Sequence, residues 1–204
     1  MLVYPVPVSA VSYSEEVKKS RFITELSATD GIDAAKAFIQ GIRKHHPAAT
    51  HHCWAFIAGA PNDSQQLGFS DDGEPAGTAG KPILAQLMGS GVGEITAVVV
   101  RYYGGVKLGT GGLVKAYGGG VQQALKLLVL KQKILLQEYH LQCKYSLLPQ
   151  VESIVHYLGG KIVSNEYGAD VRIRLALPVH TVDEAEMRLR DISRGVLHLL
   201  PISQ

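Results

Sequence analysis

Several features that define specialised classes of protein are missing from this sequence. It has only two cysteines, Cys53 and Cys143, and their wide separation excludes a disulfide-stabilised scaffold and predicts reduced thiols. No apolar run reaches the roughly 18 residues that a membrane-spanning helix needs. The first ten residues lack the basic segment of a signal peptide. We therefore expect a cytoplasmic protein that does not associate with membranes.

A large excess of charge of one sign is also missing. The chain has 20 Lys and Arg against 18 Asp and Glu, a balance too even to indicate nucleic-acid binding by itself. Residues 1–133 hold 13 basic against 10 acidic side chains, whereas residues 134–204 hold seven against eight. The first part is therefore the better candidate for binding phosphate. Hydrophobic residues make up 46% of the chain, which is enough to form a core.

The apolar periodicity of residues 1–133 predicts a first domain with mixed strands and helices. An extended hairpin or a bent strand is expected over residues 11–26, and Asp30 is expected to cap a helix that Pro47 ends. Strands are expected over 52–58 and 95–103. Thr78 is the expected cap of a helix that ends near Gly89, and a further helix is expected over 112–130.

Residues 134–204 predict a second domain with the order βαββαβ, the ferredoxin-like pattern. Its sheet should be antiparallel, with both helices on one face. The expected elements are strands at 134–144, 161–167, 171–177 and 196–199, a helix over 147–158, and a helix opened by a capping box from Thr181 to Glu184. The fold class is therefore α+β, with a domain boundary near residues 131–133.

The Gly-rich segment over residues 101–115 joins the clearest strand to a helix. Backbone amides at the start of a helix can bind an anion, and lysine or arginine side chains beside them add positive charge. Tyr102 and Tyr103 could stack on a base. The other interpretation is a tight turn with both tyrosines in the core. The residues that would bind phosphate are Arg101, Lys107, Gly109, Thr110, Gly111, Gly112 and Lys115.

A second segment, residues 70–82, is acidic and ends in Gly80 and Lys81. It is not a phosphate-binding P-loop, because prolines occupy two of the required positions. Its acids, Asp71, Asp72 and Glu74, could hold Mg²⁺ or serve as general acid and base. We favour a solvated acidic turn that starts a helix, since paired acids are common in turns rich in glycine and proline.

Histidines and basic residues supply two weaker candidates. His51 and His52 precede Cys53, but their spacing matches no zinc signature and adjacent strand residues face opposite ways. We therefore predict no metal site, no cofactor and no catalytic residues. Lys19 and Arg21 flank an expected strand, where they could bind phosphate or form a charged edge that blocks strand addition.

Taken together, four segments resemble the IMPACT family in its bacterial form. They are residues 19–23, 49–55, 69–82 and 98–117, and they occur in the family order. The resemblance implies a first domain (1–133) of the ribosomal-protein-S5-domain-2 type, as in domain IV of elongation factor G. It implies a ferredoxin-like second domain (134–204) similar to domain V of that factor. The RWD domain through which eukaryotic members restrain a kinase is not expected here.

This resemblance predicts a translation-linked regulatory protein that binds RNA or the ribosome, with other translation proteins as further candidate partners. Lys19 and Arg21 would extend the binding surface of the Gly-rich loop. Two alternatives stay open. One is a hydrolase that uses the acidic loop together with Lys81 and His51 or His52. The other is an adaptor that binds only proteins, with its glycines packed against a partner.

Overall fold

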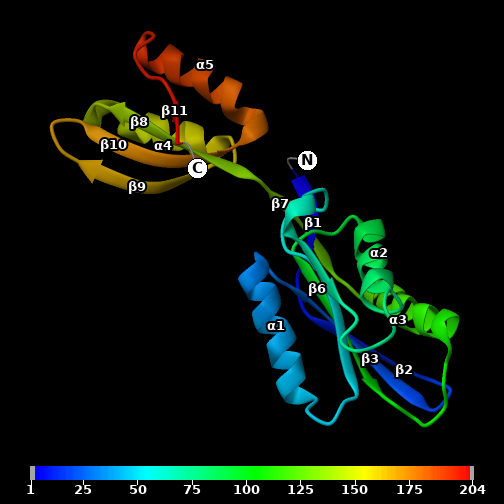
Figure 1. Ribbon diagram of the computed structural model, residues 1–204. Coiled ribbons are helices and arrows are strands. Elements are labelled where there is room, and N and C mark those ends of the chain that lie inside the picture. Colours follow the sequence, from blue (N-terminus) through cyan, green and yellow to red (C-terminus); the bar gives the residue numbers. More distant parts are fainter. Residues whose placement is uncertain (1–2, 203–204) are drawn as a thin grey trace. The chain divides into compact units, whose positions relative to one another are not determined.

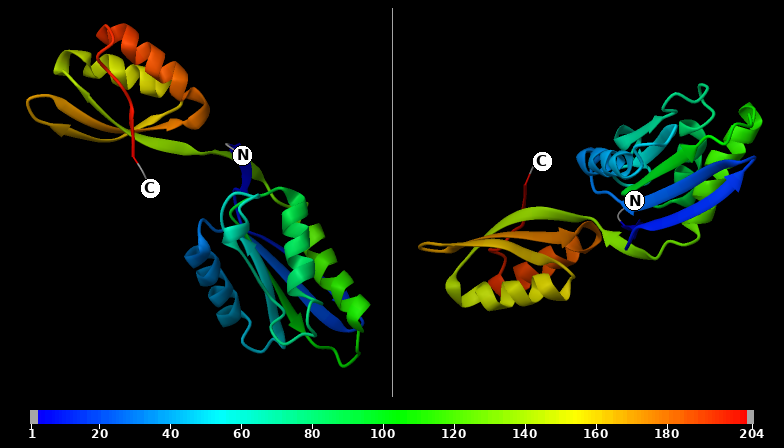
Figure 2. Two further views of the ribbon diagram at one scale, coloured as in Figure 1. Left: turned by 45° about the horizontal axis from the view of Figure 1, so that its top comes forward. Right: turned by 90° about the horizontal axis from the view of Figure 1, so that it is seen from below.

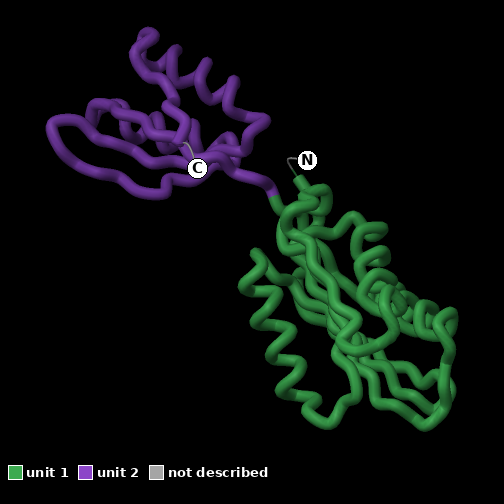
Figure 3. The backbone as a smooth tube through the Cα atoms, in the orientation of Figure 1, with its two compact units in different colours: residues 1, 3–133 green, residues 2, 134–204 purple. Residues whose placement is uncertain are grey.

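The computed structural model describes residues 3–202, which form two compact units (Figure 3). Unit 1 extends from Val3 to Lys133, and unit 2 begins at Ile134. Unit 1 contains β1 (Val3–Pro7), β2 (Val11–Val17), β3 (Ser20–Ala28), α1 (Ile32–His45), β4 (His51–Ile57), β5 (Leu67–Ser70), α2 (Gly80–Ser90), β6 (Ile95–Tyr102), α3 (Thr110–Leu125) and, at the boundary, β7 (Leu130–Ile134). The chain has the mixed α+β character that its periodicity predicts.

A five-stranded antiparallel sheet forms the centre of unit 1, in the order β2-β3-β6-β4-β5. Helix α1 covers one face, and α2 and α3 cover the other (Figure 1). Strand β6 lies in the middle: Ala97 and Val99 pack toward α2 and α3, while Val98 and Val100 pack toward α1. Burial on both faces explains why this strand is an almost unbroken apolar run.

Two glycines of α3 differ in their surroundings. A Cβ atom on Gly120 would lie 2.7 Å from the Thr24 hydroxyl oxygen, so the helix backbone approaches β3 closely there. A Cβ atom on Gly119 would meet no atom within 4 Å. Close backbone contact with the sheet therefore accounts for glycine at position 120 and not at position 119.

A second, two-stranded sheet pairs β1 with β7 and was not foreseen from the sequence. Beside it, the Tyr4 hydroxyl donates to the Glu94 carboxylate at 2.7 Å, and the Lys133 ammonium binds both Glu94 and Asp30. Gly31, not Asp30, occupies the N-cap position of α1. The prediction that Asp30 caps this helix is wrong, because its carboxylate pairs with Lys133.

Two other predicted helix starts also differ from expectation. The Thr78 hydroxyl donates to the Pro75 carbonyl at 2.6 Å, and α2 begins only at Gly80. The Thr181 hydroxyl donates to the Pro178 carbonyl at 2.9 Å, so the expected capping box does not form. In both cases the hydroxyl closes the preceding turn, which competes with capping the helix.

Unit 2 contains β8 (Leu136–Cys143), α4 (Leu148–Tyr157), β9 (Lys161–Tyr167), β10 (Val171–Pro178), α5 (Val182–Ser193) and β11 (Leu200–Pro201). The last strand is shorter and later than the predicted 196–199. The strands form an antiparallel sheet in the order β11-β8-β10-β9. Both helices lie on one face of this sheet, as predicted (Figure 2).

No helix within residues 3–202 is both long and apolar enough to cross a membrane. Across the same residues, no three or more His, Cys, Asp and Glu side chains gather closely enough to hold a metal ion.

Candidate functional site

A cavity of about 570 Å³ opens at the end of the unit 1 sheet, where β4 begins and β6 ends. Its walls come from the acidic loop before α2 and from the Gly-rich loop before α3. The residues that line it include His51, Glu74, Arg101, Tyr103, Lys107 and Leu108. Segments that are distant in the sequence therefore meet at one site.

Glu74 lies at the inner wall of this cavity, with its side chain only 4% exposed. Its Oε1 atom accepts hydrogen bonds from Arg101 Nη1 at 2.5 Å and from the Tyr117 hydroxyl at 2.7 Å. Burial and the bond to Glu74 raise the pKa of Tyr117 far above its ordinary value, so this hydroxyl remains a donor. Removal of Arg101 or of Glu74 would leave the other member of the pair as a buried charge without compensation.

Arg101 is held on several sides and is not free on the surface. Its guanidinium carbon lies 5.5 Å from the centroid of the Phe22 ring and 5.4 Å from that of Tyr103. Its Nη2 atom lies 3.4 Å from the Ser20 hydroxyl. The sequence suggested that Arg101 binds phosphate directly, whereas here the side chain is paired with Glu74 and supports the cavity wall.

His51 presents one ring nitrogen toward the cavity. Its Nδ1 atom lies 2.8 Å from the Asp72 carbonyl oxygen. Because a carbonyl can only accept, Nδ1 carries the proton, and neutral His51 keeps Nε2 as an acceptor. Nε2 lies 3.9 Å from Glu74 Oε1. His52 is buried, and its Nε2 atom lies 2.9 Å from the His46 carbonyl oxygen, so the two neighbouring histidines serve different sites.

Asp71 organises the acidic loop and replaces the predicted threonine cap. Its carboxylate accepts the backbone amides of Gly77, Ala79 and Gly80, at 2.8, 3.0 and 2.8 Å. Burial tends to raise the pKa of Asp71, but these three amides outweigh it and lower that pKa below its ordinary value. The carboxylate therefore binds the loop to the start of α2.

Asp72 has a different structural task. It accepts from Arg43 and from the His52 backbone amide, both at 2.6 Å, and its own backbone has a positive φ of 43°. With Glu74 buried as well, the loop is not the solvated acidic turn that the sequence suggested. Lys81 is exposed in the first turn of α2.

The start of α3 has no side-chain cap among the described residues. Gly109, at the N-cap position, has a φ of 76° that favours glycine. Its carbonyl accepts the Leu113 amide, and the helix then continues through 16 residues. Gly109, Thr110 and Gly111 are exposed, as are Lys107 and Lys115, but Lys115 does not line the cavity.

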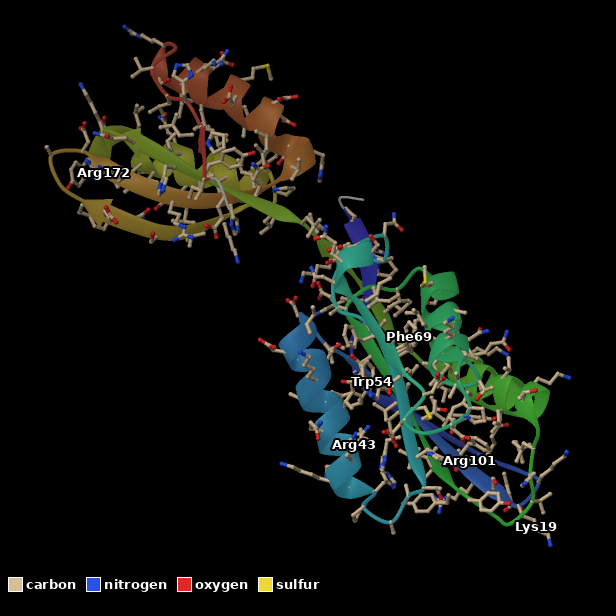
Figure 4. All side chains as sticks on the ribbon, in the orientation of Figure 1. Lys19, Arg43, Trp54, Phe69, Arg101 and Arg172 are labelled. Carbon is tan, nitrogen blue, oxygen red and sulfur yellow. The ribbon has the colours of Figure 1, made fainter. Side chains whose placement is uncertain are left out.

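The turn between β2 and β3 lies against the Gly-rich loop. A Cβ atom on Gly104 would lie only 1.8 Å from the Lys19 carbonyl oxygen, and the Gly104 amide donates to the Ser20 hydroxyl at 3.2 Å. Lys19 is exposed, and Arg21 pairs across the sheet with Tyr102. Figure 4 shows Lys19 at the same end of the sheet as Arg101. The structure thus brings together two basic segments that the sequence left apart.

Cys53 is fully buried behind this site, and its thiol donates to the Asp71 carbonyl at 3.0 Å. Burial raises the pKa of Cys53 well above its ordinary value, and burial also raises that of Cys143. Both cysteines are free, as their separation predicted. Neither thiol is poised to act as a nucleophile.

The sequence of unit 1 matches the Impact N-terminal domain over residues 18–125. This chain belongs to the IMPACT family. IMPACT family member YigZ of Escherichia coli K12 is 62% identical over 98% of each chain, and a member from Haemophilus influenzae is 51% identical over both full lengths. Residues 141–196 match DUF1949, a domain of unknown function. The chain is also similar to a crystal structure described as that of an hypothetical protein, with 61% sequence identity and a TM-score of 0.80. The match covers 100% of this chain and 99% of the chain in that structure.

The match to the IMPACT N-terminal domain includes every residue that lines the cavity. It also includes three contributors that sequence reasoning did not select: Ser20, Arg43 and Tyr117. Tyr117 lies in the matched segment, but nothing in its helical spacing shows that its hydroxyl reaches Glu74. The position of Arg43 opposite Asp72 likewise depends on tertiary packing.

Proposed function

We propose that this IMPACT protein is a cytoplasmic, translation-linked regulatory protein that binds RNA, free or in the ribosome, through unit 1. The observation that carries the proposal is the uncapped start of α3. The loop that leads directly into this helix contains the exposed Lys107. Unpaired amides and the positive end of a helix dipole favour an anion, and lysine side chains add to that attraction. RNA phosphate is such an anion.

The turn that carries Lys18 and Lys19 supports a binding surface larger than one loop. It contacts Gly104, immediately before the loop that leads to α3. We define the phosphate-binding face as Lys19, Arg21, Lys107, Lys115 and the backbone amides of residues 109–112. Cations spread over adjacent segments suit a polyanion better than a single small anion.

The domain folds supply a second line of support. We infer that unit 1 is of the ribosomal-protein-S5-domain-2 type and that unit 2 is ferredoxin-like, the pair expected from the likeness to elongation factor G. The order βαββαβ and the strand order β11-β8-β10-β9 in unit 2 support this inference. A fold shared with a translation factor is an analogy, so the phosphate-binding face has to carry the functional argument.

The hydrolase alternative has less support than the binding proposal. Asp71 is bound to three amides and Asp72 to Arg43 and the His52 amide, so both carboxylates have structural tasks. Lys81 lies outside the cavity lining. An adaptor that binds only proteins is the remaining alternative, and it predicts no dependence on phosphate.

The test is ribosome and RNA binding across a salt series, with Lys107→Glu and Lys115→Glu combined. Each phosphate contact contributes about one unit to the slope of log affinity against log salt, so the double variant should bind more weakly with a flatter slope. Lys144→Glu with Lys161→Glu makes the same charge change on exposed residues of unit 2 and is the matched control.

Both double variants should keep thermal stability close to that of the parent, because the changed side chains are exposed. If the unit 1 variant folds normally and binds with the parental slope, phosphate binding by this face is wrong. The adaptor hypothesis then takes its place.

A further inference from the structure

We propose that the cavity beside the phosphate-binding face receives a guanine base, so that the site recognises a guanosine 5′-phosphate unit. This inference rests on the proposed function and adds a base preference to it. Its support comes from the shape of the cavity, the free hydrogen-bond acceptors within it and the two cations that line it, Arg101 and Lys107.

The cavity can hold a planar ring. Pro75, Leu108 and Leu113 contribute apolar surface, and Tyr103 lies in the lining with 47% of its surface exposed. An exposed aromatic ring beside apolar side chains is a platform on which a base can stack. The volume of about 570 Å³ is within the range of small-molecule pockets.

Two side chains of the inner wall, Glu74 and His51, offer free hydrogen-bond acceptors. Every side-chain hydrogen bond and ion pair of Glu74 to the described residues uses Oε1, and Oε2 accepts none from them. His51 donates from Nδ1 to the Asp72 carbonyl, so in that tautomer Nε2 is the ring's acceptor. A ligand that satisfies both atoms must present hydrogen-bond donors side by side.

Guanine meets this requirement through N1–H and the exocyclic amine. Adenine presents an unprotonated N1 next to its amine, which would place an acceptor against an acceptor. A cationic amine would also donate, but Arg101 and Lys107 line the same cavity and disfavour a further positive charge. A neutral donor edge attached to an anionic phosphate fits both features.

The phosphate of the same unit has its own ligands. Lys107, the N-cap residue Gly109 and the first α3 residue, Thr110, line the cavity where the Gly-rich loop meets the helix. Within the cavity wall, Arg101 is 5% exposed, and its buried Nε has no hydrogen-bond partner among residues 3–202. An unpaired buried donor is costly, and an anion nearby would offset part of that cost.

The experiment titrates the whole chain with GMP, IMP and AMP, and follows the backbone amides of Gly109 and Gly111 by NMR. Inosine lacks the exocyclic amine, so IMP should bind about tenfold more weakly than GMP, the effect of one hydrogen bond to a charged acceptor. AMP should be weaker still. Tyr103→Ala should weaken GMP binding, whereas Tyr157→Ala, on an exposed tyrosine of unit 2, should not.

A second arm separates free nucleotide from RNA as the source of this unit. The single-stranded RNAs UUGUU, UUIUU and UUAUU are compared with the mononucleotides at the same salt concentration. A preference for guanine in either series supports the proposal, and the series that binds more tightly identifies the source. Equal affinities for the three bases in both series overturn it.

Failure of this proposal is distinguishable from failure of the proposed function. If binding does not depend on the base but its salt slope changes with Lys107→Glu and Lys115→Glu, the guanine site is wrong. The proposal of a phosphate-binding face then stands. If guanine is preferred and binding is unaffected by those two changes, the guanine site stands and the phosphate-binding face is wrong.

Discussion

At the scale of single residues, the site is organised by buried charges that the sequence shows only as a cluster of acids. Glu74 joins Arg101 from the end of β6 to Tyr117 from the middle of α3, so one carboxylate links three segments. Asp71 fixes the start of α2 through three amides. Whether an acid in a turn is solvated or buried depends on which partners the fold brings to it, and local composition does not contain that information.

Asp71→Asn tests the role of the three amide bonds. Near neutral pH we expect a loss of roughly 1–2 kcal/mol in the free energy of unfolding, as for a lost helix cap with charge-assisted bonds. Because the folded pKa of Asp71 is lowered, its contribution is present above the unfolded pKa of aspartate and disappears as the pH falls through the folded value.

Urea unfolding at several pH values measures this difference. The gap between parent and variant should close in acid. Glu16→Gln is the control: the Glu16 side chain is exposed and makes no hydrogen bond or ion pair to the described residues, so stability should change by less than about 0.5 kcal/mol. If parent and Asp71→Asn are equally stable at neutral pH, or if their difference in unfolding free energy stays the same in acid, Asp71 does not have this role.

At the scale of elements, periodicity located most strands and helices but not their ends. The buried run of β6 was unmistakable, since both of its faces are covered. Strands β1 and β7 were missed because each is short and finds its partner more than a hundred residues away. Thr78 and Thr181 matched capping patterns, yet each hydroxyl closes a turn. Local patterns therefore predict the type of an element better than the contacts at its ends.

Adjacent glycines in α3 give an internally controlled prediction. Gly119→Ala should stabilise unit 1 by up to about 1 kcal/mol, because alanine is the better helix former and nothing lies within 4 Å of the new methyl group. Gly120→Ala should destabilise it by roughly 1–3 kcal/mol, since the methyl group would press on the Thr24 hydroxyl. Urea midpoints of the two variants should move in opposite directions. A stabilising Gly120→Ala would mean that α3 lies farther from β3.

At the scale of the whole molecule, each unit has a core of its own. Within residues 3–202, the fully buried cluster of unit 2 draws on residues between Tyr139 and Leu199, and its four strands pair with one another. The βαββαβ order of this unit was predictable because each element has a clear period and short connections. The meeting of the Lys18–Lys19 turn with the Gly-rich loop was not, since it depends on β3 lying beside β6.

We predict that residues 134–204 fold without unit 1. The isolated segment should show a cooperative urea transition by circular dichroism, although a chain this short is expected to be only marginally stable. A matching fragment of unit 1 has to end at Lys133 or later, because β1 pairs with β7 and Lys133 binds Glu94 and Asp30. A segment 134–204 that lacks a cooperative transition would show that the two units depend on each other for folding.

The burial of both native thiols has a practical consequence for spectroscopy. Cys53 and Cys143 are 0% and 3% exposed, and their raised pKa values keep them protonated near neutral pH. A maleimide reacts with exposed thiolates, so the native cysteines should be labelled very little. A cysteine introduced at an exposed position in each unit could therefore carry a fluorophore pair without removing either native residue. Energy transfer between the two dyes would then test whether the distance between the units changes when RNA is added.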